Sequence, residues 1–410
     1  MDSTLKVLVV DDSLSQCQLL CNYLSHYGVS SVEYCHDGQA ALDKVDKDRA
    51  RPYDAIFIDL HMEGMDGLEL MQQLNKRFYR GGVVIVSSLD SRIIDYTMEV
   101  VSDYNLRLLG SIEKPIERSL VAFMVRRIRS FNNTKINPEN LPKRRDINVA
   151  MLNNQLEVYF QPIINADNNT IYSLECLCRL NMDGRGCLTP SDFLPVIEKF
   201  DLFPVFMEKL IEAAAQGLTR FEKKTGLAPI ISINLSPRQL LDECLPETLN
   251  ELLKSKHIDK SRVKFEITEN DNLNADVQKK NLSRLRIQGF DLSLDDYGAG
   301  YTNLRQIIKM PFTEIKLDTE LINGMHKDRV LRIIVESIQN LCAELKLDLV
   351  AEGVANAQDL ILLDDIGVRL FQGYFFSRPK PIDELIRWYQ SWQKTIEASC
   401  DRDKRFFDKR

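Results

Sequence analysis

The chain has 410 residues and a formal net charge of −7, because 60 acidic side chains outnumber 53 basic ones. Apolar residues make up 44% and charged residues 28% of the chain, which is typical of folded globular proteins. The length suits about two or three domains. The acidic balance argues against nucleic acid or an anionic membrane as the main partner.

The nine cysteines are odd in number, and neither they nor the five histidines are arranged at zinc-ligand spacing. We therefore expect reduced thiols rather than a disulfide scaffold or a zinc site. No apolar run reaches the roughly 18 residues that a membrane span needs. Met1 is followed by Asp2 rather than by a signal peptide. A cytoplasmic protein without membrane insertion is the prediction.

The first 125 residues alternate short β-branched runs with amphipathic stretches. Strands are predicted at 6–10, 55–58 and 83–86, and helices at 18–24 and 68–74. This β-α order predicts an α/β domain over residues 1–125, with a flavodoxin-like, doubly wound (βα)5 parallel sheet.

Residues 126–147 are predicted to hold a helix end and a linker. Between 126 and 145, seven basic side chains stand against the single acid Glu139, together with Asn-Pro and Leu-Pro turn signals. A solvated helix face and hinge is the simpler interpretation. A specific contact with the acidic neighbouring domains is the alternative.

A longer α/β pattern follows over residues 148–393. Eight strands are predicted, at 157–163, 171–180, 230–235, 263–268, 292–295, 314–317, 348–351 and 369–372. Eight strands separated by amphipathic helices fit a closed (β/α)8 TIM-type barrel. Residues 394–410 are predicted to form a polar C-terminal tail that frays.

Polar side chains end the predicted strands of the first domain. Asp11 and Asp12 follow the first strand, Asp59 ends the third, Ser87 ends the fourth, and Lys114 precedes a proline near the domain's end. Carboxyl ends of parallel strands meet at one edge of the sheet. Three carboxylates there suit one Mg²⁺, with a hydroxyl and an ammonium beside them for phosphoryl oxygens. Helix capping explains one such aspartate, but not the whole set.

The segments VVDDS, IDL, VSS and EKP, in this order, resemble the receiver domain of bacterial response regulators over residues 5–125. The resemblance implies that Asp59 accepts a phosphoryl group from a cognate histidine kinase. Asp11 and Asp12 would hold Mg²⁺, with the backbone carbonyl of His61 as a further ligand. Ser87 and Lys114 would contact the phosphoryl oxygens.

Polar residues also recur at the carboxyl ends of the predicted barrel strands, where active sites of this fold lie. They are Glu175, Asn234, Glu266, Asp295, Asp296, Lys316, Glu352 and Gln372. Five carboxylates in one cleft need protons or cations. Since no histidine is among them, Mg²⁺ or Mn²⁺ is favoured over Zn²⁺. A lone acid is more often a surface charge or a helix cap. The adjacent pair Asp295-Asp296 can bridge two metals for attack of water on a phosphodiester.

Eight ordered segments resemble the EAL-domain cyclic-di-GMP phosphodiesterases over residues 150–390. They are YFQPI (159–163), LECLCRL (174–180), INLSPRQL (233–240), FEITEN (265–270), LDDYGAGYTNL (294–304), IKLD (315–318), AEGV (351–354) and FQGYFFSRP (371–379). The resemblance implies a barrel whose first strand is antiparallel to the others. It also implies hydrolysis of cyclic di-GMP to linear pGpG.

The resemblance assigns roles to single residues. Lys316, Glu352 and Glu175 would be catalytic, with Lys316 orienting or helping to deprotonate the attacking water and Glu352 acting on the metals through water. One of the two metals would be held by Glu175, Asn234, Glu266 and Asp295, and the other by Asp295 and Asp296. Substrate contacts would come from Gln161, Leu177, Arg179 and Gln372. Glu269 would anchor the loop at 295–300, a control point and dimer contact, and a homo-oligomer through the barrel or the receiver is predicted.

The chain departs from these families at three positions. Receivers usually carry an aromatic residue three positions before the lysine, where this chain has Ser111, so a signal that depends on that ring cannot pass in the usual way. Cys176 replaces the alanine of the Glu-Ala-Leu triplet and should fit there as a small apolar residue. Ala355 replaces a glutamate that many active members carry, and such a loss commonly lowers activity about 10- to 100-fold.

Three functions are weighed. The leading hypothesis is a response regulator that hydrolyses cyclic di-GMP by a two-metal mechanism, modulated by phosphorylation of Asp59. The alternative is a degenerate barrel that binds cyclic di-GMP as a sensor without turnover, which Ala355 favours. A scaffold that binds no nucleotide is the third. The chain has no GGDEF-type sequence, so synthesis of cyclic di-GMP is not predicted.

Overall fold

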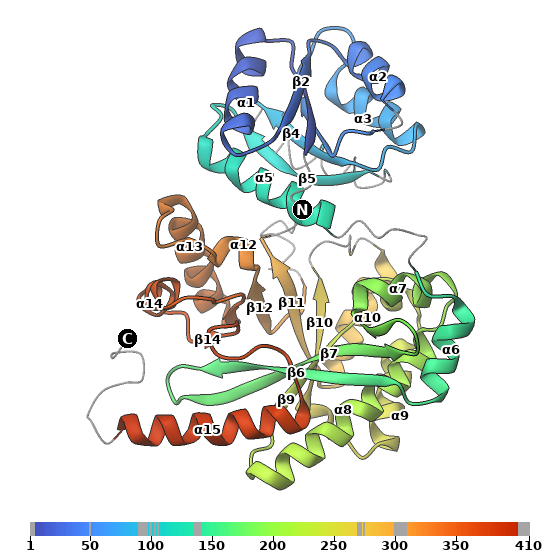
Figure 1. Ribbon diagram of the computed structural model, residues 1–410, viewed down its shortest axis with the longest axis vertical. Coiled ribbons are helices and arrows are strands. Elements are labelled where there is room, and N and C mark those ends of the chain that lie inside the picture. The colour runs from blue at the N-terminus through green and yellow to red at the C-terminus, as the bar shows by residue number, and fades with distance from the viewer. Residues whose placement is uncertain are drawn as a thin grey trace. The chain divides into compact units, whose positions relative to one another are not determined.

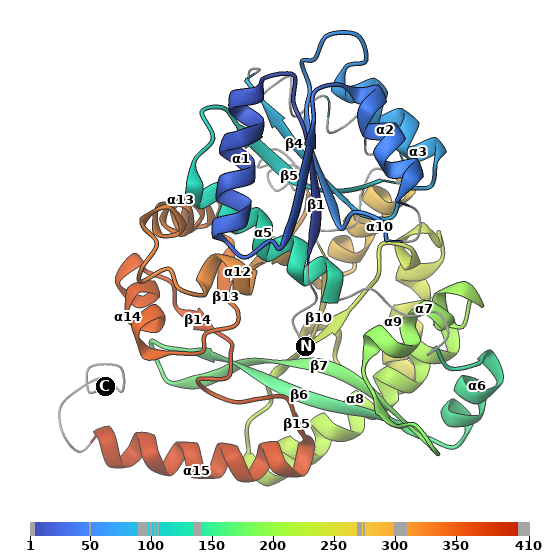
Figure 2. The ribbon, with the colours of Figure 1, turned by 45° about the horizontal axis from the view of Figure 1, so that its top comes forward.

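The computed structural model describes residues 5–48, 51–88, 106–133, 141–268, 275–298 and 310–400, together with residues 97, 101, 104 and 273. The chain divides into two units, residues 1–135 and 136–410. Figures 1 and 2 show the helices and strands of both units.

The first unit is built on a five-stranded parallel sheet in the order β2-β1-β3-β4-β5. The strands are β1 (Lys6–Val10), β2 (Ser31–Cys35), β3 (Ala55–Asp59), β4 (Gly82–Ser87) and β5 (Arg107–Glu113). The predicted flavodoxin-like sheet is confirmed, because this is the doubly wound 2-1-3-4-5 order.

Helices cover both faces of that sheet, as Figure 2 shows. They are α1 (Leu14–His26), α2 (Gly38–Lys47), α3 (Gly67–Lys76) and α5 (Arg118–Asn133). One apolar core lies under α1 and α5, and a second lies under α2 and α3. The central strands β1 and β3 are buried along their whole length, as their unbroken apolar runs predict.

The second unit is a closed barrel of eight strands. They are β6 (Leu156–Asn165), β7 (Thr170–Met182), β9 (Ile230–Asn234), β10 (Val263–Thr268), β11 (Asp291–Tyr297), β12 (Glu314–Leu317), β13 (Asp348–Ala351) and β14 (Leu370–Phe371). β6 pairs antiparallel with both β7 and β14 and so closes the ring, while the other neighbours are parallel. The predicted TIM-type barrel with an antiparallel first strand is confirmed. Two short strands, β8 (Gly186–Leu188) and β15 (Lys380–Pro381), extend β7 and β6.

Helices surround this barrel. They are α6 (Arg144–Leu152), α7 (Pro190–Lys199), α8 (Phe203–Thr225), α9 (Leu245–Ser255), α10 (Asp276–Ile287), α12 (Thr319–Ile322), α13 (Arg329–Leu345), α14 (Ala357–Ile366) and α15 (Ile382–Cys400), with 3₁₀ turns at Gln239–Leu241 and Lys260–Arg262. α15 packs on α8 beside the antiparallel strand (Figure 1). In the described part of the chain, no helix is long and apolar enough to cross a membrane.

Two boundaries differ from the sequence prediction. α6 starts at Arg144, inside the segment 126–147 expected as helix end and linker, and its buried side includes Ile147 and Met151. α15 runs to Cys400, so residues 394–400 are helical rather than part of a fraying tail. The exposed polar residues Lys394 and Thr395 at the start of this stretch look like a tail in the sequence. Residues 401–410 lie outside the described part.

Candidate functional site

The first unit gathers acidic side chains at the carboxyl ends of β1 and β3, as predicted. Asp11, Asp12 and Asp59 can each bring a carboxylate oxygen within 4.8 Å of the others. The Nζ of Lys114 lies 2.8 Å from Asp11 Oδ2 and 2.8 Å from Asp59 Oδ2. Ser87 is buried at the end of β4, and its carbonyl accepts from the Lys114 N–H at 2.8 Å. The structure therefore brings all five predicted residues to one edge of the sheet.

The charges in this cluster are partly compensated by Lys114. Burial raises the pKa of Asp59, although the hydrogen bond from Lys114 opposes the shift. Burial alone would lower the pKa of Lys114, but hydrogen bonds to Asp11 and Asp59 outweigh burial and raise it. Three carboxylates against one ammonium leave net negative charge, and an all-oxygen donor set of this kind fits one Mg²⁺.

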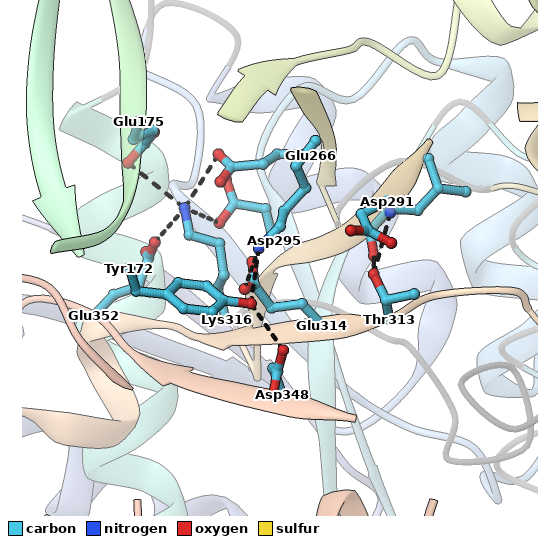
Figure 3. A network of polar contacts seen from close by, with 12 residues as sticks. Tyr172, Glu175, Glu266, Asp291, Asp295, Thr313, Glu314, Lys316, Asp348 and Glu352 are labelled. Carbon is cyan, nitrogen blue, oxygen red and sulfur yellow. Dashed lines mark hydrogen bonds and ion pairs between the residues drawn. The ribbon is translucent and has the colours of Figure 1, made fainter. Parts of the chain in front are cut away.

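The second unit has Lys316 at the centre of its carboxylates (Figure 3). The Lys316 side chain is fully buried, and its Nζ lies within 3.5 Å of four carboxylate oxygens. The distances are 2.5 Å to Glu352 Oε1, 3.1 Å to Asp295 Oδ1, 3.2 Å to Glu266 Oε2 and 3.5 Å to Glu175 Oε2. Five different strands or strand ends supply these groups: β7, β10, β11 and β12 carry four of them, and Glu352 directly follows β13.

A local irregularity of β11 turns two consecutive aspartates toward the same site. In a regular strand, adjacent side chains point to opposite faces. The pairing of β11 with β12 shifts register between Leu294 and Tyr297, and Asp296 has a φ of 57°. Aspartate tolerates this left-handed conformation better than most residues. As a result, Asp295, Asp296 and Glu352 can each bring an oxygen within 4.8 Å of the others.

Burial and mutual repulsion dominate the electrostatics of this cluster. Burial raises the pKa values of Glu266, Asp295 and Glu352, while Lys316 opposes each shift. Burial, followed by the charge of Asp295, raises the pKa of Asp296 to about 8. For Lys316, burial favours the neutral amine, but the surrounding carboxylates outweigh it and raise the pKa.

These residues fit divalent metal ions. Five carboxylates face one ammonium, so the site lacks positive charge. Glu266 also has a buried oxygen, Oε1, without a hydrogen-bond partner among the described residues. Buried carboxylate oxygens are rarely left in this state. Oxygen ligands from carboxylates and an amide suit Mg²⁺ or Mn²⁺. Asn234 lies beside this set, with its Nδ2 donating to Glu175 Oε1 at 3.4 Å.

Of the predicted substrate residues, Gln372 contacts the same cluster directly, and the others lie on β6 and β7. The Gln372 Nε2 donates to Glu175 Oε2 at 2.5 Å, and the Gln161 Nε2 donates to the Ser377 carbonyl at 3.1 Å. Leu177 and Arg179 are partly exposed on β7. The Arg179 guanidinium donates to the Cys178 carbonyl and lies 5.3 Å from the Tyr159 ring centroid. Glu269, the predicted loop anchor, lies outside the described residues.

Residues 373–378 directly follow Gln372, and in the sequence they stood out only within the FQGYFFSRP segment, without a role for any of them. A Cβ on Gly373 would lie 2.1 Å from the Val354 carbonyl oxygen, so only glycine allows this loop to cross the segment after Glu352. The Trp388 Nε1 on α15 donates to the Phe376 carbonyl at 3.2 Å. The glycine of the FQGYFFSRP segment was the one available signal, because backbone contacts leave little trace in side-chain patterns.

Two family departures can be placed in the structure. Cys176 is buried in β7, and burial raises the pKa of its thiol well above the ordinary value, so it is a neutral packing residue. Ala355 is exposed. The following Asn356 caps α14 by accepting from the Asp359 N–H at 2.9 Å.

Family models match both units. The model described as "Response regulator receiver domain" matches residues 7–126, and the model described as "EAL domain" matches residues 144–379. The second match spans more than half of the chain. The chain belongs to the EAL domain family. Its N-terminal unit is a receiver domain, as the sequence motifs predicted.

Relatives of known name support this assignment. The chain is 30% identical to the cyclic di-GMP phosphodiesterase RocR of Pseudomonas aeruginosa over 383 residues, which cover 92% of this chain and 96% of RocR. It is 32% identical to the oxygen sensor protein DosP of Escherichia coli, over 59% of this chain but only 30% of DosP. The match to RocR therefore runs through both the receiver and the EAL domain.

Solved structures resemble the EAL domain. A structure of the PaMucR phosphodiesterase in complex with c-di-GMP has a TM-score of 0.54 and 29% identity, and the match covers 59% of this chain and 98% of that chain. An EAL domain protein from Listeria monocytogenes has a TM-score of 0.53 and 29% identity, over 61% of this chain and 98% of that chain.

We expect metal-free protein to lose stability as the pH rises from about 4 to about 8. The pKa of Asp296 is raised to about 8 from its ordinary 3.8, so the folded state binds more protons than the unfolded state in this window. The stability contribution is therefore present below pH 4 and lost as the pH passes through 8. Melting temperatures at pH 5 and pH 8 in a chelator, repeated with Mn²⁺, measure this effect. Asp296→Asn should weaken the pH dependence, and an unchanged dependence in that variant would contradict the expectation.

Proposed function

We propose that this receiver–EAL protein hydrolyses cyclic di-GMP to linear pGpG with two divalent metal ions. The observation that carries the proposal is the buried Lys316 surrounded by Glu175, Glu266, Asp295 and Glu352, with Asp296 beside them. The similarity to RocR over nearly its whole length supports this substrate.

The metals, when bound, would supply an activated water and neutralise charge on the phosphodiester. In this proposal Glu175, Asn234, Glu266 and Asp295 hold one ion, Asp295 and Asp296 hold the other, and Glu352 acts through water.

Lys316 has the position of a catalytic group. Its Nζ would orient the attacking water, hold or release a proton, and stabilise the negative charge that develops on the phosphoryl oxygens. Gln372 would accept a hydrogen bond from the substrate, since its Oε1 is buried and lacks a hydrogen-bond partner among the described residues. In this proposal Arg179 would contact a phosphate with its planar guanidinium, and Gln161 and Leu177 would line the substrate.

The reaction is tested by turnover in water enriched in heavy oxygen. Full-length protein with Mn²⁺ should convert cyclic di-GMP to pGpG, and mass spectrometry should find one heavy oxygen in the new terminal phosphate. Formation of pGpG without the label would exclude attack by water.

The alternative function is a cyclic-di-GMP sensor without turnover, which the exposed Ala355 favours. Calorimetry distinguishes it from the enzyme: tight binding of cyclic di-GMP by metal-loaded protein, with the nucleotide recovered intact, would establish the sensor. The complete set of carboxylates around Lys316 favours the enzyme.

For the receiver, we propose that Asp59 is phosphorylated by a cognate histidine kinase with one Mg²⁺ held by Asp11, Asp12 and Asp59. Phosphorylation would then modulate turnover, by a route that does not use an aromatic ring at position 111. The domain limits 1–125 and 148–393 stay predictions, although α6 starts before residue 148 and α15 ends after residue 393. The cytoplasmic location and the homo-oligomer through the barrel or the receiver also stay predictions.

Asp59→Asn should abolish phosphorylation of the receiver. Asparagine keeps the shape of the side chain but cannot accept a phosphoryl group, and Lys114 keeps its other partner, Asp11. Intact-mass measurement after incubation with a small phosphoryl donor and Mg²⁺ should show one added phosphoryl group on the wild type and none on the variant. Equal phosphoryl uptake by the wild type and the variant would show that another residue is the acceptor.

A further inference from the structure

The interior of the EAL barrel contains a second polar layer beneath the metal-binding carboxylates. Lys264 and Glu314 lie two residues before Glu266 and Lys316 on their strands, so all four side chains face inward. The Lys264 side chain is 2% exposed and that of Glu314 is 1% exposed, and the two form an ion pair. A lysine and a glutamate are rarely buried so completely.

Three serines complete this layer. Ser173, Ser232 and Ser293 are each fully buried and lie two residues before Glu175, Asn234 and Asp295 on their strands. Ser232 is the register partner of Glu175 on one side and of Lys264 on the other. Ser293 is likewise the partner of Glu266 and of Glu314. Two of the serines thus stand between the upper carboxylates and the lower ion pair.

The polar atoms of this layer are not satisfied by protein. The hydroxyls of the three serines and the Glu314 Oε1 have no hydrogen-bond partner among the described residues, and neither has the Glu266 Oε1 above them. Five such atoms in one barrel interior are far from the native norm, in which buried polar groups are paired with protein or with ordered water. Serine is also small, whereas interiors of this fold are usually filled by bulky branched residues. The layer is therefore polar and lined in part by small side chains, which is the kind of surrounding in which buried water is held.

The other half of the barrel interior is different. Ile163, Val350 and Leu370 form a small apolar cluster on β6, β13 and β14. A bulge in β7 opposite Ile163 and Ile164 lets the Tyr172 ring pack against this cluster. The Tyr172 hydroxyl donates to Asp348 Oδ2 at 2.7 Å, and the Lys264 Nζ lies 4.6 Å from the Tyr172 ring centroid. Figure 3 shows Tyr172, Glu314 and Asp348 together below the Lys316 cluster. Among the described residues, the unpartnered hydroxyl and carboxylate oxygens of this layer thus lie on β7, β9, β11 and β12, whereas β6, β13 and β14 contribute the apolar cluster.

We propose that the polar half of the barrel interior is a binding site for ordered water, held by Ser173, Ser232, Ser293 and Glu314. The same water layer supports Glu266 from below, so that Ser293 is a positioning residue for the metal site. The water site stands independently of the enzymatic activity. The support of Glu266 rests on the proposed function, because it concerns the metal ligands.

The water site is tested on metal-free, full-length protein. A high-resolution crystal structure should show ordered water within hydrogen-bond distance of the three serine hydroxyls. Ser293→Ala should leave the unfolding midpoint unchanged or lower it, because a hydrated hydroxyl is already satisfied. A dry hydroxyl would give the opposite result, since removing an unsatisfied buried group stabilises a protein. Absence of these waters together with a raised midpoint would overturn the proposal.

The support of the metal site is tested by calorimetry with Mn²⁺ alone. Ser293→Val fills the water position with an apolar branch of similar size and should weaken Mn²⁺ binding about tenfold, the scale for loss of a supporting partner. Ser283→Val on the exposed face of α10 is the matched control and should bind like the wild type. Unchanged affinity in Ser293→Val would overturn the positioning role. If Ser293→Val does not fold, Ser293→Ala should show a smaller decrease in Mn²⁺ affinity. Unchanged Mn²⁺ affinity in Ser293→Ala would likewise overturn the positioning role.

These outcomes separate the two proposals. Wild-type protein that binds Mn²⁺ but does not hydrolyse cyclic di-GMP would contradict the proposed function, while the crystallographic and unfolding results would still decide the water site.

Discussion

Lys316→Met should reduce turnover of cyclic di-GMP by at least about 10²- to 10³-fold, the usual effect of removing one preorganised charge that stabilises a transition state. Methionine keeps an unbranched side chain of nearly the same length but removes the charge at the centre of four carboxylates. Steady-state formation of pGpG, measured with Mn²⁺ in excess, gives the effect on kcat and KM separately.

The same variant should also change stability in a metal-dependent way. Breaking a buried charge pair costs about 3–5 kcal/mol, so metal-free Lys316→Met should melt below the wild type. Mn²⁺ should restore much of the difference, because the cations replace the lost positive charge. Lys327→Met, on an exposed lysine, is the control and should change neither property. A Lys316→Met protein that folds, binds Mn²⁺ and turns over normally would remove Lys316 from the mechanism.

Asp295→Asn should have the second largest effect. Asp295 contacts Lys316 and belongs to the cluster with Asp296 and Glu352. In the proposed function it is the one residue that both metal positions share. We expect turnover to fall by at least about 100-fold, since supporting partners alone are worth 10- to 100-fold in metal affinity. Metal-free stability should be unchanged or higher at pH 8, because the substitution removes a buried carboxylate that burial disfavours.

Titration of chelated protein with Mn²⁺, followed by the melting temperature, measures this prediction alongside turnover. Asp291→Asn is a control on the same strand. Asp291 does not belong to the carboxylate cluster and instead forms an ion pair with Arg286, with an N–O distance of 2.7 Å. A metal-induced rise in melting temperature that is as large in Asp295→Asn as in the wild type would contradict the assignment of Asp295 as a ligand.

The sequence predicted the barrel and its polar strand ends because each of these features is repeated. Buried parallel strands read as short apolar runs, and polar residues recur once per strand at Glu175, Asn234, Glu266, Asp295, Lys316 and Glu352. Elements with mixed patterns were not placed. β2 is a half-exposed edge strand, and β5 contains Gly110 and a register shift beside it, so neither gives a continuous apolar run.

Other parts of the site depend on geometry that residue patterns do not encode. Strand alternation alone places Asp296 opposite to Asp295, and only the irregularity of β11 with a positive φ brings both to one site. The contacts of Gly373 with Val354 and of Trp388 with the Phe376 carbonyl involve backbone atoms. The buried Lys264–Glu314 pair joins residues 50 positions apart and looks like two ordinary surface charges in the sequence.

The most direct test of the central claim is turnover by full-length protein that is first stripped of metal and then reloaded. The protein should leave cyclic di-GMP intact in the presence of chelator and should produce pGpG once Mg²⁺ or Mn²⁺ is added. Folded, metal-loaded protein that binds cyclic di-GMP but forms no pGpG, with or without phosphorylation of the receiver, would contradict the claim that the carboxylates around Lys316 form a phosphodiesterase site.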